Sequence, residues 1–169
     1  MKIYIIGPSG SGKTILANQL SKKTNIEHTN LDDIFWDNKT NSFNIKREET
    51  LRNNIYNKVL NKESWIIEGA YISWPKKGFL LADKFVYLNI NNRILNQRII
   101  LRFIKRKLRI ESSAKKETLK QLISLIKWNK QQSLLMKKKI NNKEYPNLTI
   151  LSSTKEINAF INNLAAINQ

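Results

Sequence analysis

A glycine-rich segment near the start of the chain has the residue types and spacing of a phosphate-binding loop. The phosphate loop, Gly7-Pro8-Ser9-Gly10-Ser11-Gly12-Lys13-Thr14, satisfies the pattern G-x-x-x-x-G-K-[ST]. Its glycines let backbone amides turn inward around phosphate oxygens, while the lysine reaches the outer phosphates and the threonine hydroxyl ligates Mg²⁺. Such a match arises by chance in about 1% of chains of this length. We therefore predict that residues 7–14 bind a nucleoside triphosphate, namely ATP with Mg²⁺, and that Thr14 is a metal ligand.

Two adjacent carboxylates, Asp32 and Asp33, follow a polar segment that is predicted to be a strand. Ligands of an open parallel sheet bind beside the carboxyl ends of its strands, so both side chains are expected near the phosphate loop. We predict that Asp32 accepts a proton from an acceptor hydroxyl, or helps to hold Mg²⁺ through water. Capping of the next segment is the alternative for either residue, and for Asp33 the two interpretations are equally supported.

A basic stripe is predicted along one helix in the second half of the chain. Arg98, Arg102, Lys105 and Arg109 are spaced i, i+4, i+7 and i+11, which places them on one helical face. Arginine suits phosphate binding because its planar fork meets phosphate oxygens in pairs. The alternative is a basic helix that is solvated or lies along nucleic acid. The opposite side of the helix carries apolar residues that are expected to pack against the body or the following helix: Ile99, Ile100, Phe103 and Ile104.

Short apolar runs alternate with helical periodicity along the chain. Strands are predicted at five segments: residues 2–6, 26–31, 65–67, 85–88 and 148–151. Apolar residues at helical spacing predict the helices, with a break near residues 112–113: 15–20, 48–60, 94–110, 117–138 and 157–164. The second strand is the most polar and suits a sheet edge. Alternating strands and helices predict an α/β domain spanning residues 1–169, with a parallel sheet covered on both faces.

Several segments resemble the P-loop kinases of the adenylate-kinase-like group, and among these the chain is most similar to the DNA topology modulation protein family. The resembling segments are Ile5–Thr14, Leu31–Trp36, Trp65–Tyr71 and Arg98–Arg109. The phosphate loop is widely shared, whereas Leu-Asp-Asp-Ile-Phe-Trp and Trp-Ile-Ile-Glu-Gly are more particular to this family. The resemblance implies a three-layer α/β/α fold with a five-stranded parallel sheet in order 2-3-1-4-5. It also implies a helical lid at about residues 93–138.

The resemblance also implies roles for individual residues. Glu68 occupies the position where related kinases carry an acidic residue near the metal or the attacking group, and its charge should be balanced by Lys13 or Mg²⁺. A turn residue without a catalytic role is the alternative for Glu68. Arg98 and Arg102 are expected to close over the ATP phosphates as part of the lid. Ser153 follows the last strand, where the resemblance puts the loop that borders adenine.

The segment after Glu68 departs from adenylate kinase, which carries an arginine shortly after its Asp-Gly pair. This chain reads Glu68-Gly69-Ala70-Tyr71-Ile72 and has no arginine there, which argues against AMP as the acceptor. Arg47 and Arg52 lie in the segment that would cover an acceptor, although ordinary exposed helix charges are the favoured interpretation for each of them. Trp36 is the best candidate for the acceptor pocket because it follows the acidic pair.

The composition restricts the classes of protein that remain. There is no cysteine and a single His28, so thiolate and zinc sites are not expected. No signal-like or membrane-spanning stretch is evident, which predicts a cytoplasmic protein without membrane contact. Thirty Lys and Arg against thirteen Asp and Glu give a net charge of +17, which attracts phosphate-rich partners or reflects a basic residue bias.

Together these features predict a cytoplasmic phosphotransferase that moves the terminal phosphoryl group of ATP to a small-molecule acceptor, such as a nucleoside, nucleotide or metabolite. Lys13, Mg²⁺ and the lid arginines would act by positioning and by charge neutralisation. One alternative is a nucleic-acid-associated protein in which the ATP site is regulatory. A second is a nucleotide-binding switch or slow ATPase.

Overall fold

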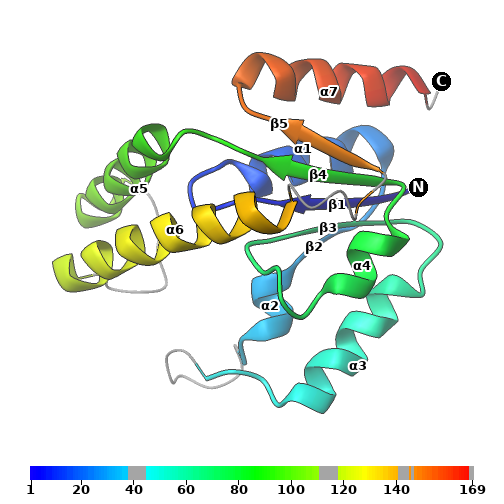
Figure 1. The fold of residues 1–169 in the computed structure, drawn as a ribbon, viewed down its shortest axis with the longest axis horizontal. Helices are drawn as coiled ribbons and strands as arrows, with labels where there is room; N and C mark the ends of the chain where they lie inside the picture. The colour runs from blue at the N-terminus through cyan, green and yellow to red at the C-terminus, as the bar shows by residue number, and fades with distance from the viewer. Residues whose placement is uncertain (38–44, 111–117, 141–144, 146, 168–169) are drawn as a thin grey trace.

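The computed structural model describes the chain except for residues 38–44, 111–117, 141–144, 146 and 168–169. Its described residues form one parallel sheet of five strands in the order β2-β3-β1-β4-β5 (Figure 1). The strands are β1 (Lys2–Ile6), β2 (His28–Asn30), β3 (Trp65–Gly69), β4 (Lys84–Leu88) and β5 (Leu148–Leu151). The predicted fold class and strand order are therefore confirmed, as is the edge position of the polar second strand.

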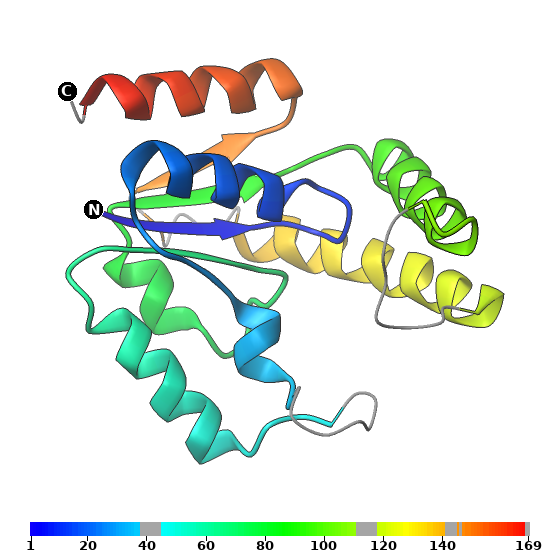
Figure 2. The same cartoon turned by 180° about the vertical axis from the view of Figure 1, so that it is seen from behind.

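Helices cover both faces of this sheet, as expected for a parallel sheet in which most side chains are apolar (Figures 1 and 2). Their bounds are α1 (Lys13–Thr24), α2 (Leu31–Phe35), α3 (Glu49–Leu60), α4 (Lys76–Leu81), α5 (Asn92–Lys107), α6 (Leu119–Ile140) and α7 (Thr154–Ile167). Among the described helices, none has both the length and the apolar composition needed to cross a bilayer.

The alternation of side chains along β1 divides the core into two layers. Ile3 and Ile5 pack in the layer that α1 and α7 close, together with residues such as Leu16, Leu20 and Ile161. Tyr4 and Ile6 face the opposite layer, which α3, α4 and the end of α6 close with residues such as Tyr56, Phe79 and Met136. Because β1 is central and buried on both sides, the loop that leaves its carboxyl end is held at a well-defined position.

The helices α5 and α6 pack against each other and extend beyond the carboxyl ends of the strands (Figures 1 and 2). On α5, Ile99 and Phe103 are buried as predicted, whereas Ile100 and Ile104 are 40% and 45% exposed. The prediction for these two residues is wrong because only one side of α5 meets the rest of the protein. Arg109 lies past the end of α5 with a positive φ of 57°, so the predicted stripe is interrupted before it.

The second strand is shorter than the predicted segment 26–31. It spans His28–Asn30, and α2 begins at the next residue, Leu31. Asn30 accepts a hydrogen bond on its side chain from the Asp32 amide at 2.8 Å and caps α2. Asp32 and Asp33 consequently lie in the first turn of α2 and not at the end of β2. The helices α2 and α4 were not predicted, since five and six residues are too few for a periodic signal. The predicted break near residues 112–113 lies outside the described residues.

Candidate functional site

The phosphate loop joins β1 to α1 and turns at two glycines. Gly10 and Gly12 have positive φ values of 79° and 95°, which residues with a side chain adopt only under strain. Gly10 also lies directly beneath α5, because a Cβ atom built on it would be 3.2 Å from the Leu95 carbonyl oxygen. The spacing of glycines therefore determines both the path of the loop and the close approach of α5 to it.

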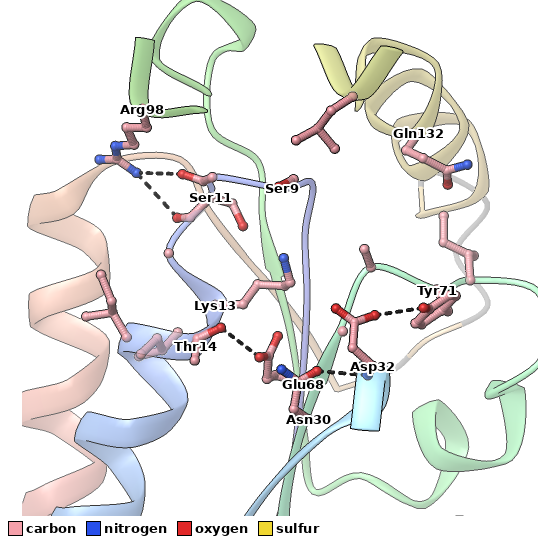
Figure 3. Close-up of a pocket in the computed structure, with 18 of the residues that line it drawn as sticks. Ser9, Ser11, Lys13, Thr14, Asn30, Asp32, Glu68, Tyr71, Arg98 and Gln132 are labelled. Atoms are coloured by element: carbon pink, nitrogen blue, oxygen red, sulfur yellow. Dashed lines mark hydrogen bonds between the residues drawn. The ribbon is translucent and has the colours of Figure 1, made fainter. Parts of the chain in front are cut away.

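Lys13 begins α1 and lies half-buried under the loop. Its Nζ donates a hydrogen bond to the Pro8 carbonyl oxygen at 3.0 Å. Burial lowers the pKa of Lys13, while the carboxylates of Glu68 and Asp32 act in the opposite direction. Figure 3 shows the Lys13 side chain between the phosphate loop and these two carboxylates, where it can meet an anion entering from the open side.

Glu68 is a buried carboxylate near the end of β3, and its residue is only 2% exposed. Strand register places it opposite Ile5 of β1 and Asn30 of β2. Its Oε1 accepts a hydrogen bond from the Thr14 hydroxyl at 2.7 Å (Figure 3). His28 Nε2 lies 3.9 Å from the same oxygen. The buried negative charge and the phosphate-loop hydroxyl are thus in direct contact.

Asp32 reaches the same space from α2. Its Oδ1 accepts a hydrogen bond from the Tyr71 hydroxyl at 2.7 Å. Burial of the ring raises the pKa of Tyr71 well above its usual range, and the hydrogen bond to Asp32 adds to this shift. The phenol is therefore a permanent donor. Figure 3 shows the second carboxylate oxygen of Asp32 on the side that faces Lys13.

Two arginines of α5 contact the phosphate loop from above. Arg98 Nη1 donates to the Gly10 carbonyl oxygen at 3.2 Å and to the Ser11 carbonyl oxygen at 3.5 Å (Figure 3). Arg102 Nη2 lies 3.5 Å from the Ser9 hydroxyl, at the limit of a hydrogen bond. The structure therefore brings both arginines to a loop from which they are separated by 88 and 93 positions in the sequence.

Asn129 on α6 is a further contact that the sequence did not single out. Its Oδ1 accepts a hydrogen bond from the Ser9 amide at 2.7 Å, and its Nδ2 donates to the Ser9 carbonyl oxygen at 3.1 Å. The residue is 1% exposed. A signal existed, because Asn129 and Ser133 interrupt the apolar spacing that ends with Met136 and Ile140 on the buried side of α6. A buried amide on such a face requires a hydrogen-bonding partner.

Most of these groups line one cavity of about 1180 Å³, whereas Asn129 and His28 lie behind its lining residues. The residues from Ser9 to Thr14 form one wall, and the predicted site residues that join them are Asp32, Glu68, Arg98 and Arg102. Gly7 and Pro8 are not among the lining residues. A Cβ atom on Gly7 would come within 2.7 Å of the Ser11 hydroxyl, so its role in the loop is close packing.

Ser153 also lies outside the lining of this cavity, and the expectation that it borders a bound adenine stays a prediction. Its hydroxyl donates to Glu156 Oε1 at 3.0 Å and accepts from the Glu156 amide at 3.2 Å, so that Ser153 caps the start of α7. Thr154, Ile157 and Asn158 of α7 line the cavity instead.

Within the described part of the chain, no cluster of three or more His, Cys, Asp or Glu side chains is arranged to hold a metal ion. Oxygen ligands are nevertheless present, since Thr14 Oγ1 and Glu68 Oε1 are adjacent. Mg²⁺ commonly keeps several waters and binds through one or two protein oxygens together with substrate phosphates. The side chains present fit that pattern, and they do not form an all-protein metal cage.

Comparison with known proteins places this geometry in a wider group. A family model described as an AAA domain (AAA_18) matches residues 3–120. No curated protein matches the sequence. Shikimate kinase from Bacteroides thetaiotaomicron superimposes with a TM-score of 0.58 at 18% identity, covering 99% of this chain and 97% of that one. A gluconokinase from Sinorhizobium meliloti 1021 gives 0.57 at 14% identity, with 98% and 94% covered.

Deoxyadenosine kinase from M. mycoides, solved with bound dATP, is similar to the same extent. Its TM-score is 0.55 at 15% identity, covering 97% of this chain and 99% of that one. At such identities the similarity establishes the fold, which is that of a P-loop kinase, and leaves the identity of the acceptor open.

Proposed function

This chain belongs to the AAA_18 family of AAA domains, and from that premise we propose that it is a phosphotransferase that moves the terminal phosphoryl group of ATP to a small hydroxyl-bearing acceptor. The observation that carries the proposal is a single cavity in which a phosphate loop with its lysine faces a carboxylate on α2. A nucleotide-binding switch needs the loop alone. The opposing Asp32 gives the cavity a group that can receive a proton.

In the proposed reaction, Asp32 accepts the proton of the acceptor hydroxyl as that oxygen forms a bond to the γ-phosphorus. The bond between the γ-phosphorus and the β–γ bridging oxygen breaks, and ADP leaves with the electron pair. Lys13 and the amides of the phosphate loop hold the outer phosphates in line with the acceptor. Tyr71 keeps the Asp32 carboxylate oriented by the 2.7 Å hydrogen bond to Oδ1.

Thr14 and Glu68 are the residues that would hold Mg²⁺, with Asp32 contributing through water. When bound, the ion would offset charge on the phosphate oxygens. The buried Glu68 supports this assignment, because the Thr14 hydroxyl supplies a hydrogen bond to the carboxylate without neutralising its charge.

We further propose that residues 93–138 act as a lid through Arg98 and Arg102. Arg98→Ala and Arg102→Ala are each expected to lower turnover by about 10-fold to 1,000-fold, with a smaller effect on ATP affinity, because both guanidinium groups lie at the phosphate loop. Steady-state kinetics with ATP and acceptor varied separately would measure this. Lys105→Ala removes an exposed charge from the same helix and serves as the control. Normal turnover in the Arg98/Arg102 double variant would contradict the lid assignment.

Asn129 is proposed as a positioning residue that keeps the phosphate loop in shape. Asn129→Ala leaves the Ser9 amide and carbonyl without their partner, so unfolding free energy should fall by about 1–3 kcal/mol. ATP should also bind more weakly, because a loosened loop must be ordered on binding. Ser133→Ala, one turn further along the same buried side of α6, is the matched control. The assignment fails if the variant is destabilised but its nucleotide dissociation constant equals that of the control.

The direct test of the proposed function is transfer of label from γ-labelled ATP, in the presence of Mg²⁺, to a pool of small metabolites. A new labelled species whose formation needs both ATP and acceptor is the expected result. Release of labelled phosphate at a rate that no acceptor alters would favour a slow ATPase and overturn the proposal.

The nucleic-acid alternative is favoured by one feature of the structure. The helices α5 and α6 each carry six Lys or Arg residues and neither contains Asp or Glu. If these helices bind nucleic acid, the Arg98→Ala and Arg102→Ala variants would keep normal turnover. Each would reduce the slope of the logarithm of the DNA-binding constant against the logarithm of salt concentration by about one.

Membership of the DNA topology modulation protein family is likewise a proposal, based on Leu31–Trp36 and Trp65–Tyr71.

A further inference from the structure

The end of the cavity next to Asp32 is walled by aromatic rings. Phe35, Trp36 and Tyr71 all line the cavity and are all half-buried. Phe35 stacks on Tyr71 with ring centroids 4.6 Å apart and planes 25° apart. Trp36 meets Phe35 edge to face at 4.8 Å and 81°. We refer to these three rings as the aromatic wall.

The aromatic wall is braced from outside the cavity. The Arg52 guanidinium lies 5.4 Å from the Phe35 ring centroid and 4.9 Å from that of Trp74. Arg52 also donates to Glu49 Oε1 at 3.1 Å, and its side chain is only 12% exposed. Trp74 is not part of the wall, but its ring centroid lies 6.2 Å from that of Phe35 and 6.0 Å from that of Tyr71, so Arg52 and Trp74 together support these two rings. The rings therefore form a supported surface and are not isolated exposed side chains.

Tyr71 connects the aromatic wall to the proposed base. The same residue stacks on Phe35 and donates its hydroxyl hydrogen to Asp32. An acceptor whose hydroxyl is close enough to Asp32 for proton transfer must then place its neighbouring atoms near these rings. Flat groups gain from such a surface because they can stack on an aromatic side chain.

A carboxylate, that of Asp32, lies beside the aromatic wall inside the cavity. Three of the cations that line it, Lys13, Arg98 and Arg102, contact the phosphate loop. Among the described lining residues, Lys139 is the remaining cation. The carboxylate of Asp32 is adjacent to the rings and would repel a second carboxylate placed beside it.

We propose that the acceptor is a compound in which the hydroxyl-bearing part is joined to a flat aromatic ring, as in a nucleoside, and that the aromatic wall binds this ring. The proposal rests on the proposed function, because it concerns the acceptor of that same reaction. It assigns Trp36 and Phe35 as specificity-determining residues that act by stacking.

Binding can be tested separately from transfer. Calorimetric titration of the protein saturated with Mg²⁺ and ADP would compare adenosine, guanosine, cytidine and thymidine with gluconate and shikimate. At least one nucleoside is expected to bind more tightly than either acid. Binding of an acid with no measurable binding of any nucleoside would overturn the proposal, whether or not label transfer is detected.

Substitutions in the aromatic wall provide a second test of the proposal. Trp36→Leu is expected to weaken binding of the preferred nucleoside and to raise its KM by about 5-fold to 100-fold, from the loss of one stacking contact. Trp36→Tyr keeps a ring and should retain most of the affinity. Both variants should bind ADP as the wild type does, which excludes a general loss of folding. Equal nucleoside affinity in Trp36→Leu, in Phe35→Leu and in the wild type would contradict the assignment of these two residues as specificity-determining. Loss of transfer from ATP to every acceptor would instead count against the proposed function.

Discussion

Replacing Lys13 with alanine is expected to reduce ATP turnover by about 100-fold to 1,000-fold, the loss typical of removing a charge-stabilising group from the reacting centre. Lys13 lies under the phosphate loop and faces the carboxylates of Asp32 and Glu68, so its charge is placed where the outer phosphates would bind. Turnover would be measured as ADP formation at saturating ATP and acceptor.

The melting temperature of Lys13→Ala should distinguish a loss of catalysis from misfolding. Because burial lowers the pKa of Lys13, the folded protein disfavours the charged ammonium relative to the unfolded chain. Removing the side chain should therefore leave the melting temperature unchanged or slightly raised. Lys22→Ala removes an exposed charge from the last turn of the same helix and should behave as the wild type in both measurements. Unchanged ATP binding and turnover in Lys13→Ala would refute nucleotide binding at the loop.

Asp32→Asn is expected to lower acceptor-dependent turnover by roughly 100-fold or more, while ATP affinity stays nearly intact. Asparagine has almost the same shape and its Oδ1 can still accept the Tyr71 hydrogen bond, but the amide cannot take a proton from the acceptor. The measurement is kcat with the acceptor varied, together with the dissociation constant for ATP.

Asp33→Asn provides a closely matched control for this change. Both carboxylates lie in the first turn of α2 and are exposed, so their interactions with the helix terminus are similar. Asp32 lines the cavity, whereas Asp33 is not among the lining residues. A loss of stability without a loss of turnover in Asp32→Asn would show that the residue only stabilises α2. Equal kinetic losses in both variants would also remove Asp32 from its proposed role.

Much of the fold could be predicted because its determinants are local in sequence. The apolar runs of β1, β3 and β4, the glycines of the phosphate loop and the helical spacing in α1 and α3 each reflect the neighbours of a residue along the chain. Their alternation predicts a parallel sheet, while the strand order came from the family resemblance and is confirmed by the strand pairing. The short helix α2 was not predicted, and its first residue, Leu31, was assigned to the preceding strand.

The residues predicted for the site lie in one cavity, except for Gly7, Pro8 and Ser153. For Ser153 the difference has a simple cause, since the serine caps α7 through Glu156 and the next turn of the helix reaches the cavity. Tyr71 and Asn129 were missed as site residues. Neither belongs to a chemical motif, and each acquires its importance from a partner that sequence spacing does not reveal.

The sequence alone therefore determined the phosphate loop, the α/β class and the set of charged residues that can serve a phosphoryl transfer, because these depend on residue type and short-range order. Tertiary structure decided which of them meet. The contacts Thr14 to Glu68, Asp32 to Tyr71 and Ser9 to Asn129 span 54, 39 and 120 positions. The first two contacts depend on how the strands align in the sheet, and the third depends on how α6 packs against the phosphate loop. Such contacts are set by the packing of the whole core.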